Sequence, residues 1–473
     1  MFIISAFLLT ANIMLGGATR AGILSDAVLQ LLSVPGLLAV LYRWDKMPAT
    51  AVGFRTAIAV CCAIVLMPLV QLLPMPAGWV AQIEPNTAIA DVLRLVGMSP
   101  SFRTLSVSPY ATALGALSLL PPVTLFLLVL GLSKPERRHL SLVLIALGLL
   151  SIGLGLLQLA QGSGSRLRFH AYTNFDDAVG FFANRNHFSA LIYCAIVLAV
   201  AWFPQANPSA FKKRPQTPSR IPDFALTAVV AAIVFVMIVA AVTARSRAGI
   251  VLALVALPVA IMTNVQVRQL LPGRASRRIA VGVFAALVLF VFEFSAYRMV
   301  ERFTGDASAD SRISFTRNTI AAAKAYMPFG AGVGTFTVVY PQFPKVGDEV
   351  IDTYANRAHN DVLELWLEGG LLFIGIAIAF LATIALHARR VWPGSRTPSG
   401  GRTDAADAAL ARASLIVIVL LLVHSSVDYP LRTGAMMSVL AFACATLVAA
   451  PMRGPALAGT RGTRGSLSQP VAA

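Results

Sequence analysis

Charged side chains are scarce in this chain of 473 residues. They make up 12% of it, whereas hydrophobic residues make up 57%, and the mean hydropathy is +0.75. A soluble globular protein carries roughly a quarter charged residues, so this composition excludes an ordinary soluble domain. We therefore expect a protein that is solvated mainly by lipid.

Acidic residues are the scarcer of the two charge types, with 21 Asp and Glu against 38 Lys and Arg, which gives a net charge of +17. A basic surplus of this size raises the question of nucleic-acid binding. The sequence offers no soluble basic domain and no platform of aromatic residues for stacking bases, so we expect no nucleic-acid partner. The topology of a membrane protein explains the basic residues better.

Cysteine is rare as well. The four cysteines are Cys61, Cys62, Cys194 and Cys444, and all lie inside apolar runs without the spacing of metal ligands. Free cysteines of this kind behave as small core residues. The sequence therefore predicts neither a disulfide nor a metal site.

Long apolar runs, by contrast, recur along the whole chain. About 20 apolar residues suffice to cross the hydrocarbon core of a bilayer, and we predict about twelve such segments, at 2–18, 23–42, 54–74, 111–133, 140–160, 187–203, 224–243, 248–264, 279–297, 361–386, 411–427 and 433–450. The first could be mistaken for a signal peptide, but it lacks a basic region ahead of the apolar stretch. We expect an all-α membrane protein with about twelve transmembrane helices and membrane lipids around it.

The basic residues alternate along this topology. If both termini are cytoplasmic, the loops richest in Lys and Arg all fall on the cytoplasmic face, as the positive-inside rule requires. They carry Arg43 and Lys46; Lys134, Arg137 and Arg138; Lys212, Lys213, Arg214 and Arg220; Arg268, Arg274, Arg277 and Arg278; and Arg389, Arg390, Arg396 and Arg402. We predict a single polytopic domain over 1–473, with a cytoplasmic tail at 451–473.

The outer loops of this topology are predicted at 75–110, 161–186 and 298–358, and a very short one holds Arg245, Ser246 and Arg247. The loop at 298–358 is too short for an independent domain but long enough for one or two helices over the mouth of the membrane domain. Residues 311–326 show apolar residues near helical spacing, with Asp310 or Ser311 as the N-cap. We expect this helix to end at Pro328.

Arginines gather on the predicted outer side, where the positive-inside rule disfavours them. They are Arg185, Arg245, Arg247, Arg312 and Arg317. A guanidinium binds phosphate through two parallel hydrogen bonds, which lysine cannot copy. The group suggests a diphosphate site, and the alternative is that each arginine reaches lipid headgroups.

His359 stands where the large loop re-enters a helix, in the run Arg357-Ala-His359-Asn360-Asp361. Asn360 and Asp361 are good caps, so we predict His359 at the helix N-terminus beside Arg357. The helix end and the cation both disfavour an imidazolium, which would leave His359 neutral and able to act as a general base on a sugar hydroxyl. A lone histidine is more often structural, but the position of His359 at a helix N-terminus beside Arg357 favours a catalytic role.

Three acidic residues follow on one helical face, Asp361, Glu364 and Glu368. Ionisable groups are costly inside a membrane and are usually paired or functional, so we expect Glu364 and Glu368 to pair with an arginine of the site. His424 and Asp428, four residues apart in a later span, are expected to hydrogen-bond to each other as a structural pair.

The glycines Gly330, Gly332 and Gly334 follow a predicted helix instead of opening one after a strand. This order argues against a nucleotide-binding fingerprint and favours a tight turn. At the lip of the sixth span, Asn186 has the position of an N-cap, yet it faces the same outer compartment as Arg185.

Five short motifs occur in order over about 180–432. They are Gly180-Phe-Phe-Ala-Asn184-Arg-Asn186-His187-Phe-Ser-Ala; Ser246-Arg247-Ala-Gly249; Arg312 leading to Pro328-Phe-Gly330-Ala-Gly332-Val-Gly334-Thr-Phe336; His359-Asn360 leading to Glu368-Gly369-Gly370; and His424-Ser-Ser-Val-Asp428-Tyr-Pro-Leu-Arg432. Together they resemble the O-antigen ligase and O-antigen polymerase superfamily of bacterial membrane glycan transferases. The first 160 residues agree with that superfamily only in hydropathy.

The resemblance implies a GT-C-like enzyme of the bacterial inner membrane with a large periplasmic loop. It would move a glycan from undecaprenyl diphosphate to an acceptor hydroxyl, on lipid A-core or a growing glycan, without a nucleotide sugar or, in the ligases, a metal. Arg247 and Arg312 would hold the diphosphate and His359 would activate the acceptor. The remaining expected substrate contacts are Arg317, Arg245, Arg185, Asn186, Asn360 and Glu368.

One position departs from the family pattern. Ligases typically show Gly, Thr or Tyr three residues after the glycine equivalent to Gly370, and this chain has Phe373. Both a ligase of lipopolysaccharide and a polymerase of O-antigen or exopolysaccharide therefore stay open. A flippase for lipid-linked oligosaccharides and a non-catalytic partner of a polysaccharide machine are the alternatives outside this chemistry. Transporters tend to show related halves and ionisable groups at the bilayer midplane, whereas here the polar groups gather at the outer rim.

Overall fold

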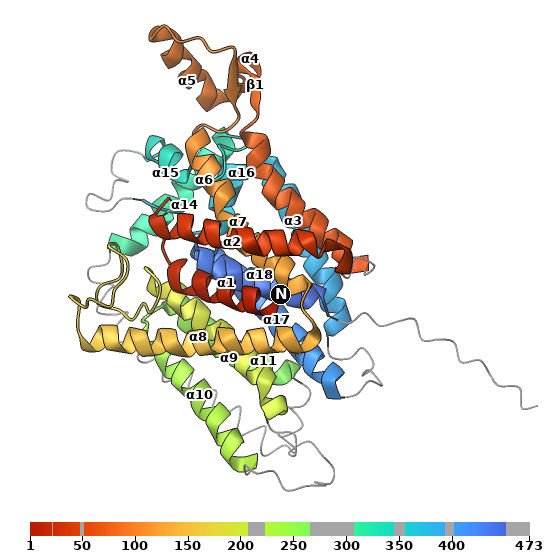
Figure 1. Cartoon of the computed structure of the whole chain (residues 1–473). Helices are drawn as coiled ribbons and strands as arrows, with labels where there is room; N and C mark the ends of the chain where they lie inside the picture. Colours follow the sequence, from red (N-terminus) through yellow and green to blue (C-terminus); the bar gives the residue numbers. More distant parts are fainter. Residues whose placement is uncertain are drawn as a thin grey trace, which may run out of the picture.

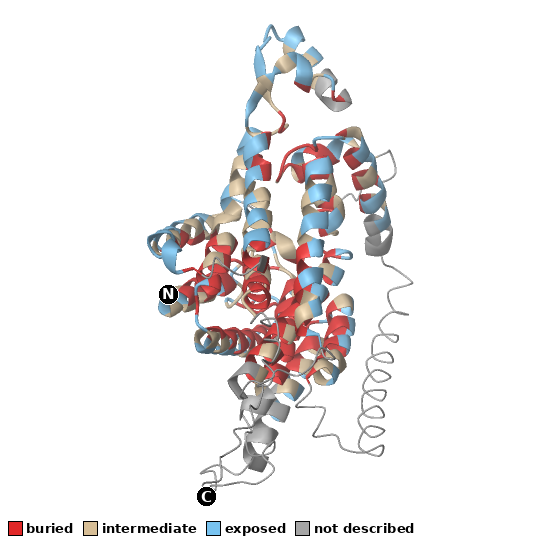
Figure 2. Cartoon of the chain, turned by 90° about the vertical axis from the view of Figure 1, so that its right-hand side faces the viewer, coloured by how far each residue is buried: buried red, intermediate tan, exposed pale blue. Residues whose placement is uncertain are grey.

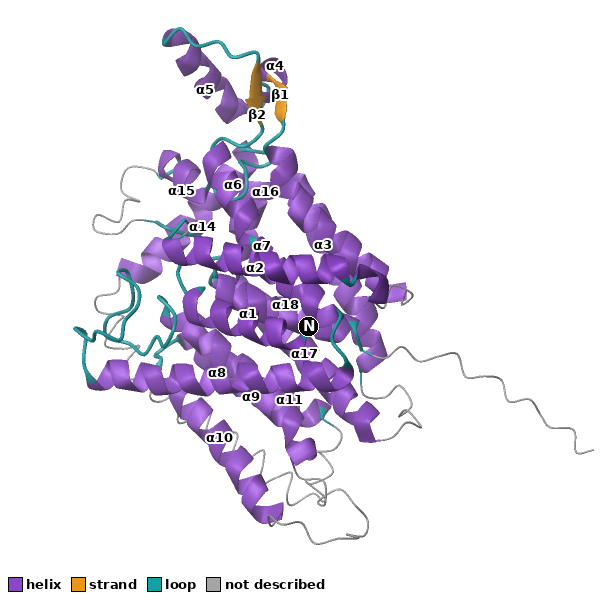
Figure 3. Cartoon of the chain, in the orientation of Figure 1, coloured by secondary structure: helices purple, strands orange, loops and turns teal. Residues whose placement is uncertain are grey.

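The computed structural model describes residues 1–20, 22–47, 52–206, 223–264, 307–344, 355–392 and 402–450. Within these ranges the chain is built almost entirely of helices (Figure 3), as predicted. The predicted span at 279–297 and the predicted tail at 451–473 lie outside the described residues.

Helices occupy eleven of the twelve predicted apolar segments. They are α1 (Phe2–Leu15), α2 (Leu24–Tyr42), α3 (Val52–Gln71), α6 (Pro109–Ser118), α7 (Leu120–Leu130), α8 (Lys134–Ala160), α9 (Arg185–Ala206), α10 (Asp223–Thr243), α11 (Arg247–Thr263), α16 (Asp361–Val391), α17 (Arg402–Ser425) and α18 (Gly434–Val448), with a short 3-10 helix η1 (Trp44–Lys46) after α2. The segment predicted at 111–133 is divided into α6 and α7, because Pro121 and Pro122 cannot donate the backbone hydrogen bonds of a continuous helix.

Seven helical segments in the described ranges are long and apolar enough to cross a membrane. They are Leu24–Tyr42, Gly53–Gln71, Pro109–Leu130, Lys134–Ala160, Arg185–Trp202, Asp361–Val391 and Ala405–Ser425, and four further apolar helices are shorter. So many such helices in one chain indicate a multi-pass membrane protein. The total of twelve spans stays a prediction.

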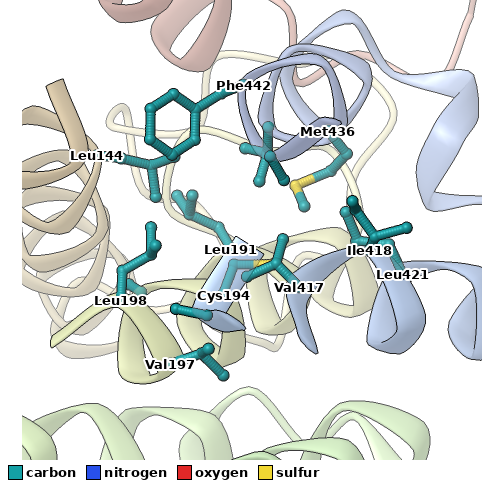
Figure 4. Packing of buried hydrophobic residues seen from close by; sticks show 14 of the residues in the cluster. Leu144, Leu191, Cys194, Val197, Leu198, Val417, Ile418, Leu421, Met436 and Phe442 are labelled. Atoms are coloured by element: carbon teal, nitrogen blue, oxygen red, sulfur yellow. The ribbon is translucent and has the colours of Figure 1, made fainter. Parts of the chain in front are cut away.

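Helix α9 lies at the centre of the bundle. It packs against α8, α10, α11 and α17, and its residues 188–201 are all buried. Figure 4 shows part of this core, in which Leu191 and Leu198 of α9 belong to one cluster with Leu144 of α8 and Phe442 of α18. Because neighbouring helices surround α9, the N-terminal end of α9 at Arg185 is held rigidly, together with the side chains that it carries.

The predicted helix of the large loop is α14 (Ala307–Ala325), followed by α15 (Phe336–Val339) and the 3-10 helix η3 (Tyr340–Gln342). It ends before Pro328, as predicted. It begins at Ala307, so the predicted N-cap at Asp310 or Ser311 is wrong, since both residues lie inside the first turns. Helix α14 packs against α16, the helix that follows the loop.

Residues 74–104, called the 74–104 unit below, depart from the all-α prediction. Strand β1 (Pro74–Pro76) pairs antiparallel with β2 (Phe102–Thr104), and α4 (Ala77–Val80) and α5 (Glu84–Leu95) lie between them. Figure 1 shows the unit beyond the ends of α3 and α6, apart from the other helices. The sequence predicted only a loop here, because strands of three residues are too short to give an alternating pattern.

Candidate active site

Helix α16 begins at Asp361, and Asn360 is its N-cap. The side-chain oxygen of Asn360 accepts a hydrogen bond from the backbone N–H of Leu363 at 3.0 Å, which confirms the predicted helix start. His359, directly ahead of the cap, has a φ of +52°. This left-handed conformation costs a residue with a side chain roughly 1–2 kcal/mol. Among the described residues other than glycine, Arg245 (φ +53°) is the one other with a positive φ, and such strain is typically retained at functional sites.

The ring of His359 faces a buried carboxylate. Its Nδ1 lies 3.5 Å from Oδ1 of Asp428, whose side chain is 1% exposed, whereas the His359 side chain is 26% exposed. The ring stacks on Phe315 of α14 with centroids 5.9 Å apart and meets Tyr429 edge-on at 4.9 Å. Two aromatic rings therefore hold the imidazole with one nitrogen toward an acid and part of the ring open, which is how an acid orients a catalytic histidine.

Asp428 is fixed from several sides. Its carboxylate accepts a hydrogen bond from Nδ2 of Asn186. Its backbone N–H donates to the carbonyl of His424 at 2.9 Å, and its own carbonyl accepts from the backbone N–H of Asp361 at 3.2 Å. Burial by itself would raise the pKa of Asp428, but the side chain of His359 and the other histidines nearby outweigh burial and lower that pKa. Asp428 is therefore a carboxylate at neutral pH.

The predicted hydrogen bond between His424 and Asp428 is present, but it joins backbone groups: the N–H of Asp428 donates to the carbonyl of His424 at 2.9 Å. Nδ1 of His424 lies 3.1 Å from the hydroxyl of Tyr193, and Asp428 turns to Asn186 and His359 instead. The spacing of four residues implied contact only inside a helix. Helix α17 ends at Ser425, three residues before Asp428.

Asp177, in the connection between α8 and α9, brings two of the predicted site arginines together. Its buried carboxylate lies 2.7 Å from Nη1 of Arg185 and 3.8 Å from Nη1 of Arg245. Arg185 directly precedes Asn186, which contacts Asp428. The arginine pair and the histidine–aspartate pair are thus adjacent at the N-terminal end of α9. The backbone N–H of Asn186 bonds to the side chain of Asn184 at 2.8 Å, so the capping role expected of Asn186 belongs to the residue two positions earlier.

Arg247 and Arg317 are both exposed. Arg247 is the first residue of α11, where Ser246 caps the helix by accepting a hydrogen bond from the backbone N–H of Gly249 at 3.1 Å. The backbone of Arg312 lies in α14, one turn before the Phe315 that stacks on His359. Its side chain lies outside the described part of the structure, and its role stays a prediction.

The first turns of α16 carry a buried network of ion pairs. Nη1 of Arg432, in the 3-10 helix η4 (Pro430–Arg432), lies 2.7 Å from Oε2 of Glu368. Its Nε lies 3.4 Å from Oε1 of Glu364 and 3.5 Å from Oδ1 of Asp361. Nη1 of Arg357 lies 2.9 Å from Oε1 of Glu364.

These contacts confirm that Glu364 and Glu368 pair with arginines, but the partners are Arg432 and Arg357. Glu368, expected to contact substrate, is fully buried and bonded to Arg432. Glu364 also accepts a hydrogen bond from the backbone N–H of Ala358 at 2.9 Å. The network therefore fixes the backbone on which His359 is held.

The three glycines of the loop dock onto a break in α16. Gly330, Gly332 and Gly334 have φ of +77°, +110° and +82°, and Gly370 inside α16 has φ of +54°. The backbone N–H of Gly332 donates to the carbonyl of Glu368 at 3.0 Å, and that of Leu371 donates to the carbonyl of Pro328 at 2.7 Å. A Cβ at Gly370 would lie 2.2 Å from that Pro328 oxygen. The predicted turn is confirmed, and two separate motifs prove to be one interlocked unit.

Gln71, the last residue of α3, ties this unit to its surroundings. Its Nε2 donates to the carbonyl of Glu368 at 2.7 Å, and its Oε1 accepts from the backbone N–H of Val333 at 3.0 Å. No sequence signal marked this buried glutamine, because its partners are backbone groups of distant segments.

A cavity of about 1170 Å³ opens between α2, α3, α6, α16 and α18. Its lining includes apolar residues of α3, α16 and α18 as well as the charged and polar residues Arg20, Asp26, Asn356, Arg357 and Arg432. Asn356 and Arg357 directly precede the His359 segment, so the cavity adjoins the candidate site. A mostly apolar lining that also carries arginines suits an amphiphile with an anionic head.

One family model matches part of the chain. Residues 232–377 match the family model described as O-antigen ligase. The matched range contains the motif at 246–249, α14, the glycine segment, His359 and the break at Gly370, whereas the motifs at 180–190 and 424–432 lie outside it. No curated protein matches the chain.

Proposed function

Because residues 232–377 match O-antigen ligase, which confirms the resemblance of this chain to the ligase and polymerase superfamily, we propose a specific glycan transfer for it. The chain is a glycosyltransferase of the bacterial inner membrane that moves a glycan from undecaprenyl diphosphate to an acceptor hydroxyl. As a ligase it would use lipid A-core as the acceptor. As a polymerase of O-antigen or exopolysaccharide it would use a growing glycan.

The observation that carries this proposal is the His359–Asp428 pair. A partly exposed imidazole is held in a strained backbone conformation, with a buried carboxylate 3.5 Å from its Nδ1. That carboxylate orients the ring and stabilises the imidazolium that forms when Nε2 accepts a proton. A positioned base of this kind contributes about 10²–10⁴-fold to a rate.

The donor would lie across the cavity and the arginines. The isoprenoid tail fits the apolar wall of the cavity beside α16, and Arg247 and Arg312 hold the diphosphate, assisted by Arg317 and the Arg185–Arg245 pair. With the termini in the cytoplasm, as the distribution of Lys and Arg predicts, this site faces the periplasm.

In the proposed step, His359 takes the proton of the acceptor hydroxyl as its oxygen attacks the anomeric carbon of the donor glycan. The bond between that carbon and the diphosphate oxygen breaks, and the electron pair leaves with undecaprenyl diphosphate. The arginines stabilise the negative charge that develops on the leaving group, so their contribution is electrostatic. Asn360 and Glu368 keep the first turns of α16 in place around the reacting groups.

The test is a deletion strain complemented with wild type, His359→Ala, Asp428→Asn or the control His139→Ala. His139 is exposed near the start of α8, in a predicted cytoplasmic loop, so its variant should restore wild-type glycan. Lipopolysaccharide, carrier-linked glycan and secreted polysaccharide are then resolved on gels, with membrane insertion of each variant checked by immunoblot.

For a ligase, the two site variants should leave long chains on the carrier and bare lipid A-core. For a polymerase, they should leave single repeat units that do not lengthen. Normal glycan from correctly inserted His359→Ala would exclude His359 as the base. If purified protein moved lipid-linked oligosaccharide between leaflets without forming a glycosidic bond, the flippase alternative would replace this proposal.

A further inference from the structure

The 74–104 unit exposes large apolar side chains. Trp79 is 65% exposed, Leu95 86%, Val96 64%, Met98 57% and Phe102 62%. These residues come from α4, α5, the turn after α5 and β2, so they belong to different elements of one small unit. So many exposed large apolar side chains within one short stretch of chain indicate contact with a membrane or another molecule.

Helix α5 is amphipathic. Asp91 and Arg94 form an exposed ion pair at 3.2 Å, while Ile89, Val92 and Val96 follow one another at spacings of three and four residues. Such spacing places the apolar side chains on one face. A short amphipathic helix accompanied by a tryptophan is typical of segments that lie flat in the membrane interface.

Exposed apolar side chains also occur at the end of α3, directly before the unit. Leu66, Leu69, Val70 and Leu73 are all exposed near the end of this helix, and α3 is long and apolar enough to cross the membrane. Strand β1 starts at Pro74, so the unit is attached to the end of that lipid-facing surface. Figure 2 shows the unit mostly exposed beyond the end of the helix that carries it.

We propose that the 74–104 unit lies in the interface of the lipid bilayer, with Trp79, Leu95, Val96, Met98 and Phe102 inserted among the upper acyl chains. The occupant of the apolar surface is therefore lipid. The charged residues of the unit are Glu84, Asp91, Arg94 and Arg103, which cancel. Insertion is driven by the burial of apolar surface, and it depends on neither anionic lipid nor salt.

This placement bears on the cavity, because the segment after β2 lines it and Gln71 before β1 is hydrogen-bonded to that segment. After β2 the chain runs through Ser108, Tyr110 and Leu114, which line the cavity. Before β1 stands Gln71, which accepts the backbone N–H of Ser106 at 3.0 Å through its own carbonyl. A unit anchored in the interface holds the rim of the cavity at the depth where lipid headgroups lie.

The experiment uses the full chain in nanodiscs of phosphatidylcholine whose acyl chains are brominated at shallow or deep carbons. The Trp79 signal is the difference in fluorescence between wild type and Trp79→Phe. The matched control is Trp202→Phe, because Trp202 packs on the core and its indole N–H donates to Ser141 at 2.7 Å. We expect shallow bromines to quench the Trp79 signal at least twofold more than deep ones and the Trp202 signal hardly at all.

Three further outcomes decide the proposal. Aqueous iodide should quench Trp79 weakly in nanodiscs, and neither phosphatidylglycerol nor 0.5 M salt should change the bromine quenching. The double variant Leu95→Asp with Val96→Asp, at exposed positions, should move Trp79 toward the aqueous phase. A Trp79 signal that iodide quenches fully and bromolipid does not would overturn the proposal, and so would a signal protected from both, which would mean that protein covers the surface. None of these readouts uses glycan transfer.

Discussion

Replacing Arg432 with methionine would remove the cation that three buried carboxylates share. Its side chain is 11% exposed, and its guanidinium lies 2.7 Å from Glu368, 3.4 Å from Glu364 and 3.5 Å from Asp361. Methionine keeps much of the aliphatic volume but leaves those carboxylates facing Arg357 alone. Breaking a buried ion pair by removing one partner costs about 3–5 kcal/mol. We expect Arg432→Met to lower the free energy of unfolding by at least that order.

A double-mutant cycle isolates the shortest of these contacts. Glu368→Gln removes one negative charge and keeps the shape, leaving Arg432 with two carboxylates, so we expect it to cost about 1–3 kcal/mol. In the double variant the loss should be smaller than the sum of the two single losses by roughly 1–3 kcal/mol, because the pair is lost only once. The stabilities of wild type, the two single variants and the double variant are measured by thermal unfolding of the purified proteins in one detergent.

The control for the cycle is Arg94→Met, which breaks the exposed Arg94–Asp91 pair at 3.2 Å. An exposed pair contributes at most about 1 kcal/mol, so this variant should melt close to wild type. Strict additivity of Arg432→Met and Glu368→Gln would refute the reasoning, because it would mean that the two side chains do not interact. An effect of Arg432→Met as mild as that of Arg94→Met would refute it as well.

Three further predictions concern backbone strain and pH. Gly370→Ala adds a Cβ 2.2 Å from a carbonyl oxygen at a positive φ, so it should lower the free energy of unfolding by about 2 kcal/mol or more. The control Gly375→Ala, with open space around the added Cβ, should leave the melting temperature unchanged or slightly higher. Equal effects of the two variants would contradict the break in α16. Arg245→Gly should relieve the left-handed strain by about 1 kcal/mol yet reduce glycan transfer tenfold or more, because the contact with Asp177 is lost; unchanged transfer would remove Arg245 from the site. The folded-state pKa of Asp428 is lowered, so the stability that its carboxylate contributes is complete above the unfolded pKa of about 4 and is lost as pH falls. The difference in melting temperature between wild type and Asp428→Asn should therefore be constant from about pH 5 to 8 and shrink below about pH 4. A difference that widened on acidification would contradict a lowered pKa.

Much of the helical architecture could be predicted, because a bilayer imposes both length and polarity on each crossing segment. Helix α14 was also predictable, since Pro328 ends it within a few residues. The 74–104 unit escaped prediction because its strands are three residues long. The break at Gly370 escaped as well, since a glycine pair inside an apolar run is compatible with a continuous helix.

The candidate site was predictable where local chemistry marks it. The caps around His359 gave the start of α16 and the place of the histidine beside it. Its partner Asp428, the Asp177 that joins the arginines and the Arg432 of the buried network came from other segments. Tertiary packing alone brings these side chains together, and the spacing of four residues between His424 and Asp428 accounts only for their backbone hydrogen bond.

The break at Gly370 changes where the membrane begins along α16. A continuous helix of 31 residues would be roughly 46 Å long at 1.5 Å per residue, well beyond a hydrocarbon core of about 30 Å. The part that follows the break, from Leu371 to Val391, measures about 31 Å and matches one hydrocarbon core by itself. The acidic turns before Gly370 thus form a separate short helix seated on the end of a membrane helix. We therefore expect the hydrocarbon core to begin near Leu371 and to leave these carboxylates outside it.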